Sequence, residues 1–158
     1  MVDILPLNGL IYNPEKISKY SEVLAPPYDI ISSSLKEDLK KHNPYNIIFL
    51  TLPDETSNKD KYENAKAILA LWLKEEILKY DLKKCFYLFE ETFMENGSQK
   101  SFKGFVGLLK VEEYGVGKVL RHEKTLSKPK EDRLALLKSC RTNFEFIYTI
   151  YNDSDEKR

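Results

Sequence analysis

Cysteine and glycine are scarce in this sequence of 158 residues, and both shortages exclude classes of site. The two cysteines, Cys85 and Cys140, form neither a CxxC motif nor a zinc-ligand spacing, so a disulfide framework and a zinc cluster are not expected. The six glycines are not arranged as GxGxxG or as GxxxxGK[ST]. The sequence therefore lacks the two common glycine-rich loops that hold nucleotide phosphates.

Long hydrophobic runs and net charge are also absent. No stretch of about 18 apolar residues is present that would cross a bilayer, and residues 1–6 lack the basic and apolar regions of a signal peptide. We therefore expect a soluble cytoplasmic protein with reduced thiols. The 25 basic and 25 acidic side chains cancel, which argues against a general polyanion-binding protein and against nucleic acid as a partner, although a local basic patch stays allowed.

What the sequence does contain is typical of one folded domain. Hydrophobic residues make up 42% and charged residues 32%, and Tyr and Phe are numerous, at 10 and 8. A chain of this length buries enough surface to fold without a disulfide or a metal. We expect one domain over residues 1–151, followed by a wholly polar tail over residues 152–158.

Helices and strands are expected in irregular order. Helices are predicted over residues 35–41 after a run of serines, over residues 58–80 where apolar residues recur every three or four positions, and from residue 127, where Pro129 suits a first turn. Strands are predicted over residues 7–12, 47–52, 85–94, 100–111, 118–120 and 144–151, with Asn96-Gly97 as a hairpin-turn signal. This order predicts an α+β fold, or an irregular α/β fold, with a mixed sheet partly covered by about three helices.

Basic residues gather before and along the last predicted helix. Only Glu123, Glu131 and Asp132 oppose eight basic residues there, which are Lys118, Arg121, Lys124, Lys128, Lys130, Arg133, Lys138 and Arg141. Lysines at a helix start oppose the helix dipole at about 0.3–1 kcal/mol each unless an anion binds there. Free N–H groups with converging Lys and Arg side chains form a phosphate site. The alternative is an ordinary solvated basic helix start.

Three further residues are candidates for chemistry. His122 could act as a general base, a metal ligand or a phosphate donor, or it could be a hydrogen-bonded structural histidine. Glu123 could hold Mg²⁺ or accept a hydroxyl proton, or it could pair with a neighbouring lysine. Asp29 follows Pro26-Pro27, whose fixed φ angles make a rigid loop that can hold a catalytic carboxylate. The alternative for Asp29 is to cap the next turn.

Five segments of the sequence occur in the order seen in the "domain of unknown function 1015" family of bacterial and archaeal proteins. They are Ala25-Pro26-Pro27-Tyr28-Asp29-Ile30-Ile31-Ser32, Asn43-Pro44-Tyr45-Asn46, Gly104-Phe105-Val106-Gly107-Leu108, His122-Glu123-Lys124-Thr125 and Pro129-Lys130-Glu131-Asp132-Arg133-Leu134. The sequence resembles this family over nearly its whole length. It departs at Ser127, where the family usually has glycine. Family proteins are much longer, so the resemblance is to their N-terminal part, and a site shared with the remainder would be incomplete here.

The resemblance implies, more distantly, the fold of the ParB–sulfiredoxin-like group, whose members bind nucleotide phosphates through a basic motif at a helix start. The group includes CTP-binding partition proteins, ATP-using sulfiredoxins and free serine kinases. The sulfiredoxin reaction needs a cysteine where Leu120 stands, and the partition function needs a DNA-binding helical domain, for which this chain leaves no room.

We therefore expect a nucleotide- or phosphate-binding domain with kinase-like phosphoryl transfer from ATP with Mg²⁺ to a small hydroxylated metabolite. Its expected phosphate ligands are Lys124, Lys128, Lys130 and Arg133, with Arg141 as a further donor from the helix end, and its expected catalytic residues are His122, Glu123 and Asp29. The alternative is a non-catalytic regulatory module that binds an anion or the acidic segment of a partner.

Overall fold

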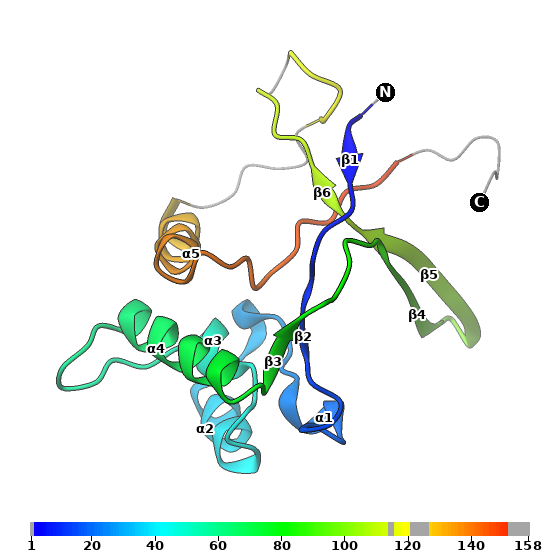
Figure 1. Ribbon diagram of the computed structural model, residues 1–158. Coiled ribbons are helices and arrows are strands. Elements are labelled where there is room, and N and C mark those ends of the chain that lie inside the picture. The colour runs from blue at the N-terminus through cyan, green and yellow to red at the C-terminus, as the bar shows by residue number, and fades with distance from the viewer. Residues whose placement is uncertain (1, 114–115, 121–126, 152–158) are drawn as a thin grey trace.

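The computed structural model describes residues 2–113, 116–120 and 127–151, in which helices and strands alternate irregularly (Figure 1). The helices are α1 (Tyr20–Val23), α2 (Ser33–His42), α3 (Ile48–Thr51), α4 (Lys61–Lys74) and α5 (Ser127–Cys140), and a 3-10 turn, η1, covers Tyr28–Ile30. The strands are β1 (Ile4–Leu5), β2 (Leu10–Tyr12), β3 (Leu78–Tyr80), β4 (Tyr87–Glu95), β5 (Ser98–Val106) and β6 (Leu108–Leu109). The fold is α+β.

The strands form three separate two-stranded ladders. β1 pairs with β6, β2 with β3 and β4 with β5, and each of these pairings is antiparallel. The predicted mixed sheet is therefore wrong for the part of the chain that the structure describes. A mixed sheet needs parallel neighbours joined by a crossover, whereas these strands pair only in twos.

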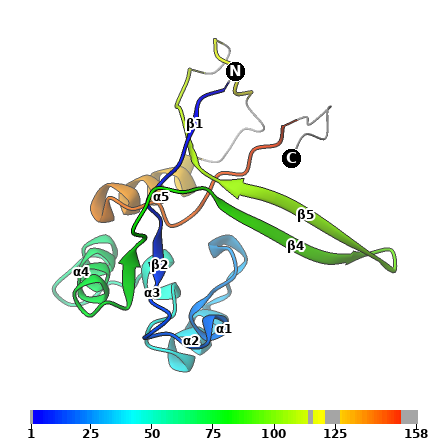
Figure 2. The ribbon, with the colours of Figure 1, turned by 45° about the vertical axis from the view of Figure 1, so that its right-hand side comes forward.

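The β4–β5 ladder is a long ribbon that projects away from the helices (Figure 2). Glu95 lies opposite Ser98, so that Asn96 and Gly97 form the two-residue turn, with φ angles of 50° and 77°. Positive φ at both turn residues matches the right-handed twist of the flanking strands. Further along, Gly104 lies opposite Phe89, whose ring covers it closely: a Cβ atom on residue 104 would come within 2.5 Å of the ring.

The core lies between the helices and the β2–β3 ladder. Its buried members share large apolar side chains and come from separate parts of the chain; they are Tyr12, Ile17, Val23, Leu50, Leu69, Trp72, Ile77 and Leu78. Burial raises the pKa of Tyr12, whose hydroxyl donates to the carbonyls of Val23 and Tyr45. The one tryptophan packs near Tyr12 and Tyr45, with ring centroids 6.4 and 6.0 Å away.

The predicted strand over residues 47–52 is wrong, because this run forms the short helix α3. Its apolar side chains are largely buried, and Leu50 is 0% exposed. A short, fully apolar run is compatible with a buried strand or a buried helical turn, and periodicity does not separate them. Here the preceding residue decides the outcome, since the Asn46 side chain accepts the N–H of Ile48 at the start of the helix.

The predicted helix over residues 58–80 is correct in its middle and too long at its end. α4 stops at Lys74, and Glu76 adopts a φ of 58°. The N–H of Ile77 then donates to the carbonyl of Trp72, which satisfies a carbonyl at the helix end in the manner of a Schellman motif. The chain therefore reverses, and residues 78–80 become β3 against β2 rather than a last helical turn.

The predicted strands over residues 118–120 and 144–151 are also wrong. Neither segment is a strand in the structure. β1, to which either segment could have been added, pairs with β6. Apolar side chains along the second segment are exposed, as at Ile147 and Ile150, and no strand of the described residues pairs with this segment.

The helix predictions over residues 35–41 and from residue 127 are confirmed by α2 and α5. Ser32 caps α2 by accepting the N–H of Leu35, as its residue type suggested. No helix in the described residues has both the length and the apolar composition that a bilayer-spanning helix needs.

Candidate functional site

The first two turns of α5 lie where three other segments of the chain come together. Lys128 and Lys130 are exposed in the first turn, and Asp132 and Arg133 are half-buried in the next. Leu136, which is 2% exposed, anchors the helix to the body of the protein. One face of the helix start is therefore held against the protein while its lysines reach solvent.

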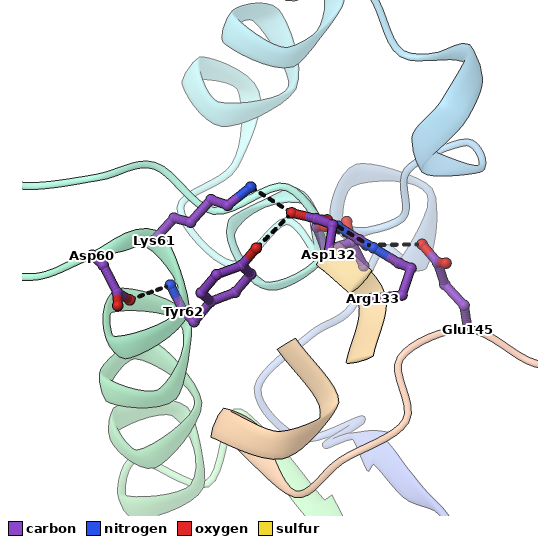
Figure 3. Close-up of polar contacts among 7 residues, drawn as sticks. Asp60, Lys61, Tyr62, Asp132, Arg133 and Glu145 are labelled. Carbon is purple, nitrogen blue, oxygen red and sulfur yellow. Dashed lines mark hydrogen bonds and ion pairs between the residues drawn. The ribbon is translucent and has the colours of Figure 1, made fainter. Parts of the chain in front are cut away.

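Asp132 is the acceptor for three side chains (Figure 3). Lys61 and Tyr62, from the first turn of α4, donate to its Oδ1 at 2.5 and 2.8 Å. Arg133 donates to its Oδ2 through Nε at 3.1 Å and through Nη2 at 2.6 Å. The α4 residues are held in place because Asp60 caps that helix, accepting the N–H groups of Tyr62 and Glu63 at 2.8 Å each.

Arg133 links the remaining segments to α5. Its Nη1 donates to the carbonyl of Thr51 at 2.8 Å, at the end of α3, and to Oε1 of Glu145 at 3.4 Å. The guanidinium carbon lies 4.3 Å from the ring centroid of Tyr28, in η1, which is a stacked cation–π contact. We call these residues the Arg133 cluster: Tyr28, Thr51, Lys61, Tyr62, Asp132, Arg133 and Glu145.

The two carboxylates of the Arg133 cluster, Asp132 and Glu145, have pKa values shifted in opposite directions. Burial acts to raise the pKa of Asp132, but the hydrogen bonds from Lys61, Arg133 and Tyr62 outweigh it and hold the pKa far below its usual range. For Glu145, burial raises the pKa, and the attraction of Arg133 only partly opposes this. Asp29 lies close enough to Glu145 to raise the pKa of Glu145 further. Asp132 is therefore a fixed anion, whereas Glu145 holds its proton more tightly than an ordinary glutamate.

The guanidinium of Arg133 is largely occupied within the protein. Arginine has five N–H donors, and four of them have acceptors on Asp132, Thr51 and Glu145. The sequence suggested a direct phosphate ligand at this position. The observed geometry instead makes Arg133 the residue that joins α3, α5, η1 and the segment that follows α5.

The other predicted ligands are not all close together. Lys128 and Lys130 are both in the first turn of α5, but Arg141 follows its last residue, with its N–H bonded to the carbonyl of Leu137. Arg141 lies thirteen positions after Lys128, which at a helical rise of 1.5 Å per residue is about 20 Å. One phosphate group cannot contact both ends, so Arg141 does not share a site with the lysines at the helix start.

The three predicted catalytic residues have different outcomes. Asp29 is exposed on η1, directly beside Tyr28 of the Arg133 cluster. His122 and Glu123, together with the predicted ligand Lys124, lie outside the described residues. Among residues that the structure describes, no group of three His, Cys, Asp or Glu side chains is placed to hold a metal ion.

Several members of the Arg133 cluster could not be found by sequence reasoning. Lys61 and Tyr62 look like ordinary first-turn residues of a helix, and Glu145 like a charge within a predicted strand. Asp132 was visible only as an acid among bases. Two features of the sequence were partial signals. A tyrosine directly after a double proline is held rigidly enough to stack on a guanidinium, and an adjacent Asp-Arg pair can form a charge-assisted hydrogen bond.

Comparison with known proteins gives one result. A family model described as "Protein of unknown function (DUF1015)" matches residues 4–158. The chain belongs to this family. No curated protein and no solved structure matches it. In this DUF1015 chain, two of the segments that carry the family resemblance, the double-proline loop and the start of α5, meet where Arg133 stacks on Tyr28. The relation to the ParB–sulfiredoxin-like group stays a prediction.

Proposed function

We propose that this DUF1015 chain binds a phosphate group, most readily that of a nucleotide, at the start of α5 beside η1. One observation carries the proposal. The Arg133 cluster holds the first two turns of α5 against η1, and Lys128 and Lys130 on α5 and Asp29 on η1 are exposed. Exposed cations at a helix N-terminus, with a carboxylate on a neighbouring rigid turn, suit a phosphate-bearing ligand.

The structure changes which residues we assign to the phosphate. Lys128 and Lys130 supply the charge-assisted contacts, and Lys124 and His122 are proposed as further donors from the segment just before the helix. Arg133 takes a positioning role, because its guanidinium is already bonded to Asp132, Thr51 and Glu145. Arg141 is left out, since it lies at the opposite end of α5.

Phosphoryl transfer is the reaction that such a site would best support. The γ-phosphoryl group of ATP would move to the hydroxyl oxygen of a small metabolite such as serine, ADP would leave, and the hydroxyl proton would pass to a carboxylate. Asp29 is the described carboxylate best placed for this role, and Glu123 is the alternative. Mg²⁺ usually binds through one or two carboxylates and the substrate phosphates, so a dedicated cluster of acids is not required for it.

Removing the two lysines tests the binding site. We expect Lys128→Ala and Lys130→Ala each to weaken binding of ATP or ADP by about 10- to 150-fold, because a hydrogen bond to a charged group contributes about 1.5–3 kcal/mol. Isothermal titration calorimetry with ATP, ADP and CTP measures this. The matched control is Lys138→Ala, which removes an exposed lysine from the other end of the same helix and should change the affinity less than twofold. Equal losses in all three variants would contradict a local site.

A non-catalytic regulatory module is the second candidate. It is favoured by the same occupied guanidinium, because Arg133 is not available to stabilise charge in a transition state. Turnover separates the two candidates: a kinase forms ADP from ATP when serine and Mg²⁺ are present, and Asp29→Asn slows this reaction. A binding module shows saturable nucleotide binding with no ADP formed.

A further inference from the structure

We infer that Asn46 is a positioning residue, which sets the place of both Tyr28 and the Thr51 carbonyl around Arg133. Asn46 is 0% exposed, and the hydrogen bonds of its side chain go to Glu22, Leu24 and Ile48 and not to the residues assigned to ligand binding. The inference rests on the proposed function, since it concerns how the same site is held in shape.

The side chain of Asn46 is fully engaged in the interior. Its Nδ2 donates to the carbonyls of Glu22 and Leu24, at 2.9 Å each, and its Oδ1 accepts the N–H of Ile48 at 3.0 Å. A buried amide side chain is costly unless it is bonded in this way. The neighbouring N–H of Ile47 donates to the carbonyl of Val23 at 2.7 Å, so residues 46 and 47 together bind three successive carbonyls.

These bonds fix the point from which the double-proline loop departs. α1 has only four residues and no side-chain cap, so little within the helix itself holds it in place. Leu24, whose carbonyl Asn46 binds, is followed at once by Ala25-Pro26-Pro27. The prolines have fixed φ angles and cannot donate hydrogen bonds. A rigid segment that starts from a fixed carbonyl therefore delivers Tyr28 to its position against Arg133.

The same residue also sets the second contact of Arg133. Through its bond to Ile48, Asn46 holds the start of α3, which is one turn long. The last residue of that turn is Thr51, whose carbonyl accepts from Arg133 at 2.8 Å. Asn46 thus connects the segment that carries Tyr28 with the one that carries the Thr51 carbonyl. A change at Asn46 should therefore disturb both contacts of Arg133, the one with the Tyr28 ring and the one with the Thr51 carbonyl.

Asn46→Asp is the variant that tests this inference. It has the same shape and keeps an oxygen for the N–H of Ile48, but it replaces the donor NH₂ with an oxygen that faces two carbonyls. We expect at least a 10-fold loss of ATP affinity by calorimetry. We also expect faster hydrogen exchange at the amide of Ile30, which donates to the carbonyl of Pro27, with α4 as protected as in the wild type.

Asn13→Asp is the control for buried asparagine chemistry in general. Asn13 is 4% exposed and its Oδ1 accepts a backbone N–H, that of Glu15 at 3.2 Å, so this side-chain bond stays within residues 13–15 and does not reach the loop before Tyr28. We expect this control to keep wild-type ATP affinity within twofold, whatever its melting temperature. If Asn46→Asp binds ATP as the wild type does, or if Asn13→Asp loses as much affinity, the inference is wrong.

A glycine inserted between Leu24 and Ala25 provides the test that does not depend on Asn46→Asp folding. It leaves every bond of Asn46 in place but uncouples Leu24 from the prolines, so ATP affinity should again fall at least 10-fold. Wild-type affinity in this insertion variant would overturn the inference. If the wild-type protein binds no ATP at all, the proposed function fails, and the exchange rate of the Ile30 amide still decides whether Asn46 positions the loop.

Discussion

Arg133 occupies the centre of the candidate site because a planar guanidinium can do two things at once. Its edge donates several hydrogen bonds in fixed directions, and its face stacks on an aromatic ring. In this protein the edge binds Asp132, Thr51 and Glu145, and the face lies on Tyr28. A lysine at this position would provide one point charge and could not join these groups in the same geometry.

Asp132 gives the first prediction at the scale of residues. Its folded-state pKa is lower than the unfolded-state value near 3.9, so its interactions stabilise the protein fully above about pH 4 and are lost as the pH falls through the folded-state pKa. Asp132→Asn should lower the free energy of unfolding at neutral pH by about 2 kcal/mol, since it removes charged hydrogen-bond partners from half-buried Lys61 and Arg133.

Urea unfolding measured at several pH values checks this expectation. The difference between Asp132→Asn and the wild type should shrink steadily below about pH 4, because the Asp132 carboxylate of the unfolded chain then takes up a proton while that of the folded protein stays ionised, which favours the unfolded state. Asp38→Asn removes the same charge from the exposed surface of α2 and serves as the control. A difference that stays constant down to pH 2 would contradict the assignment of a lowered pKa to Asp132.

At the scale of elements, short side chains at the ends of helices decide where the site residues lie. Asp60 ends the loop before α4 and turns Lys61 and Tyr62 toward α5 (Figure 3). Asn46 performs a related task before α3, and Ser32 before α2. Each of these residues accepts a backbone N–H that has no partner inside its helix, which is the reason that Asp, Asn and Ser are favoured there.

The cap of α4 gives a prediction at this scale. Asp60→Ala should lower the free energy of unfolding by about 1 kcal/mol, and by no more than about 2 kcal/mol, because two N–H groups at the helix start lose their acceptor. Chemical denaturation measures the loss. Asp60→Asn keeps an acceptor oxygen and should stay close to the wild type. If both variants lose the same amount, the charge of Asp60 matters and its capping bonds do not.

At the scale of the whole molecule, the core and the projecting β4–β5 hairpin differ in how far their apolar side chains are buried. The core residues lie between α3, α4 and the β2–β3 ladder, whereas the β4–β5 ribbon extends away from them (Figures 1 and 2). Large apolar side chains on and near the ribbon are exposed, as Leu88 is at 85%. Stability should therefore be concentrated in the part that carries the Arg133 cluster.

Leu50→Ala tests where the stability resides. Leu50 is 0% exposed in the core, so its truncation should lower the free energy of unfolding by about 2–5 kcal/mol through lost burial and a cavity. Leu82→Ala makes the same chemical change at a side chain that is 96% exposed and should have an effect within about 0.5 kcal/mol. Both values come from thermal or urea unfolding. Similar losses for the two variants would contradict this division of the molecule.

The sequence by itself determined the features that depend on local chemistry. The serine cap and helix near residue 33, the α5 helix and the family membership follow from residue types and their order along the chain. These features were predictable because a cap, a turn or a periodic apolar face is built from residues a few positions apart.

Tertiary structure alone decided the remainder. It made residues 48–51 a helix, whose first N–H, that of Ile48, is accepted by the buried side chain of Asn46, and it left residues 144–151 unpaired with any strand of the described residues. It also assigned Arg133 to an internal role, since Asp132, Thr51, Glu145 and Tyr28 surround it from distant parts of the chain. Contacts between residues so far apart depend on how the elements pack together, which no local pattern in the sequence encodes.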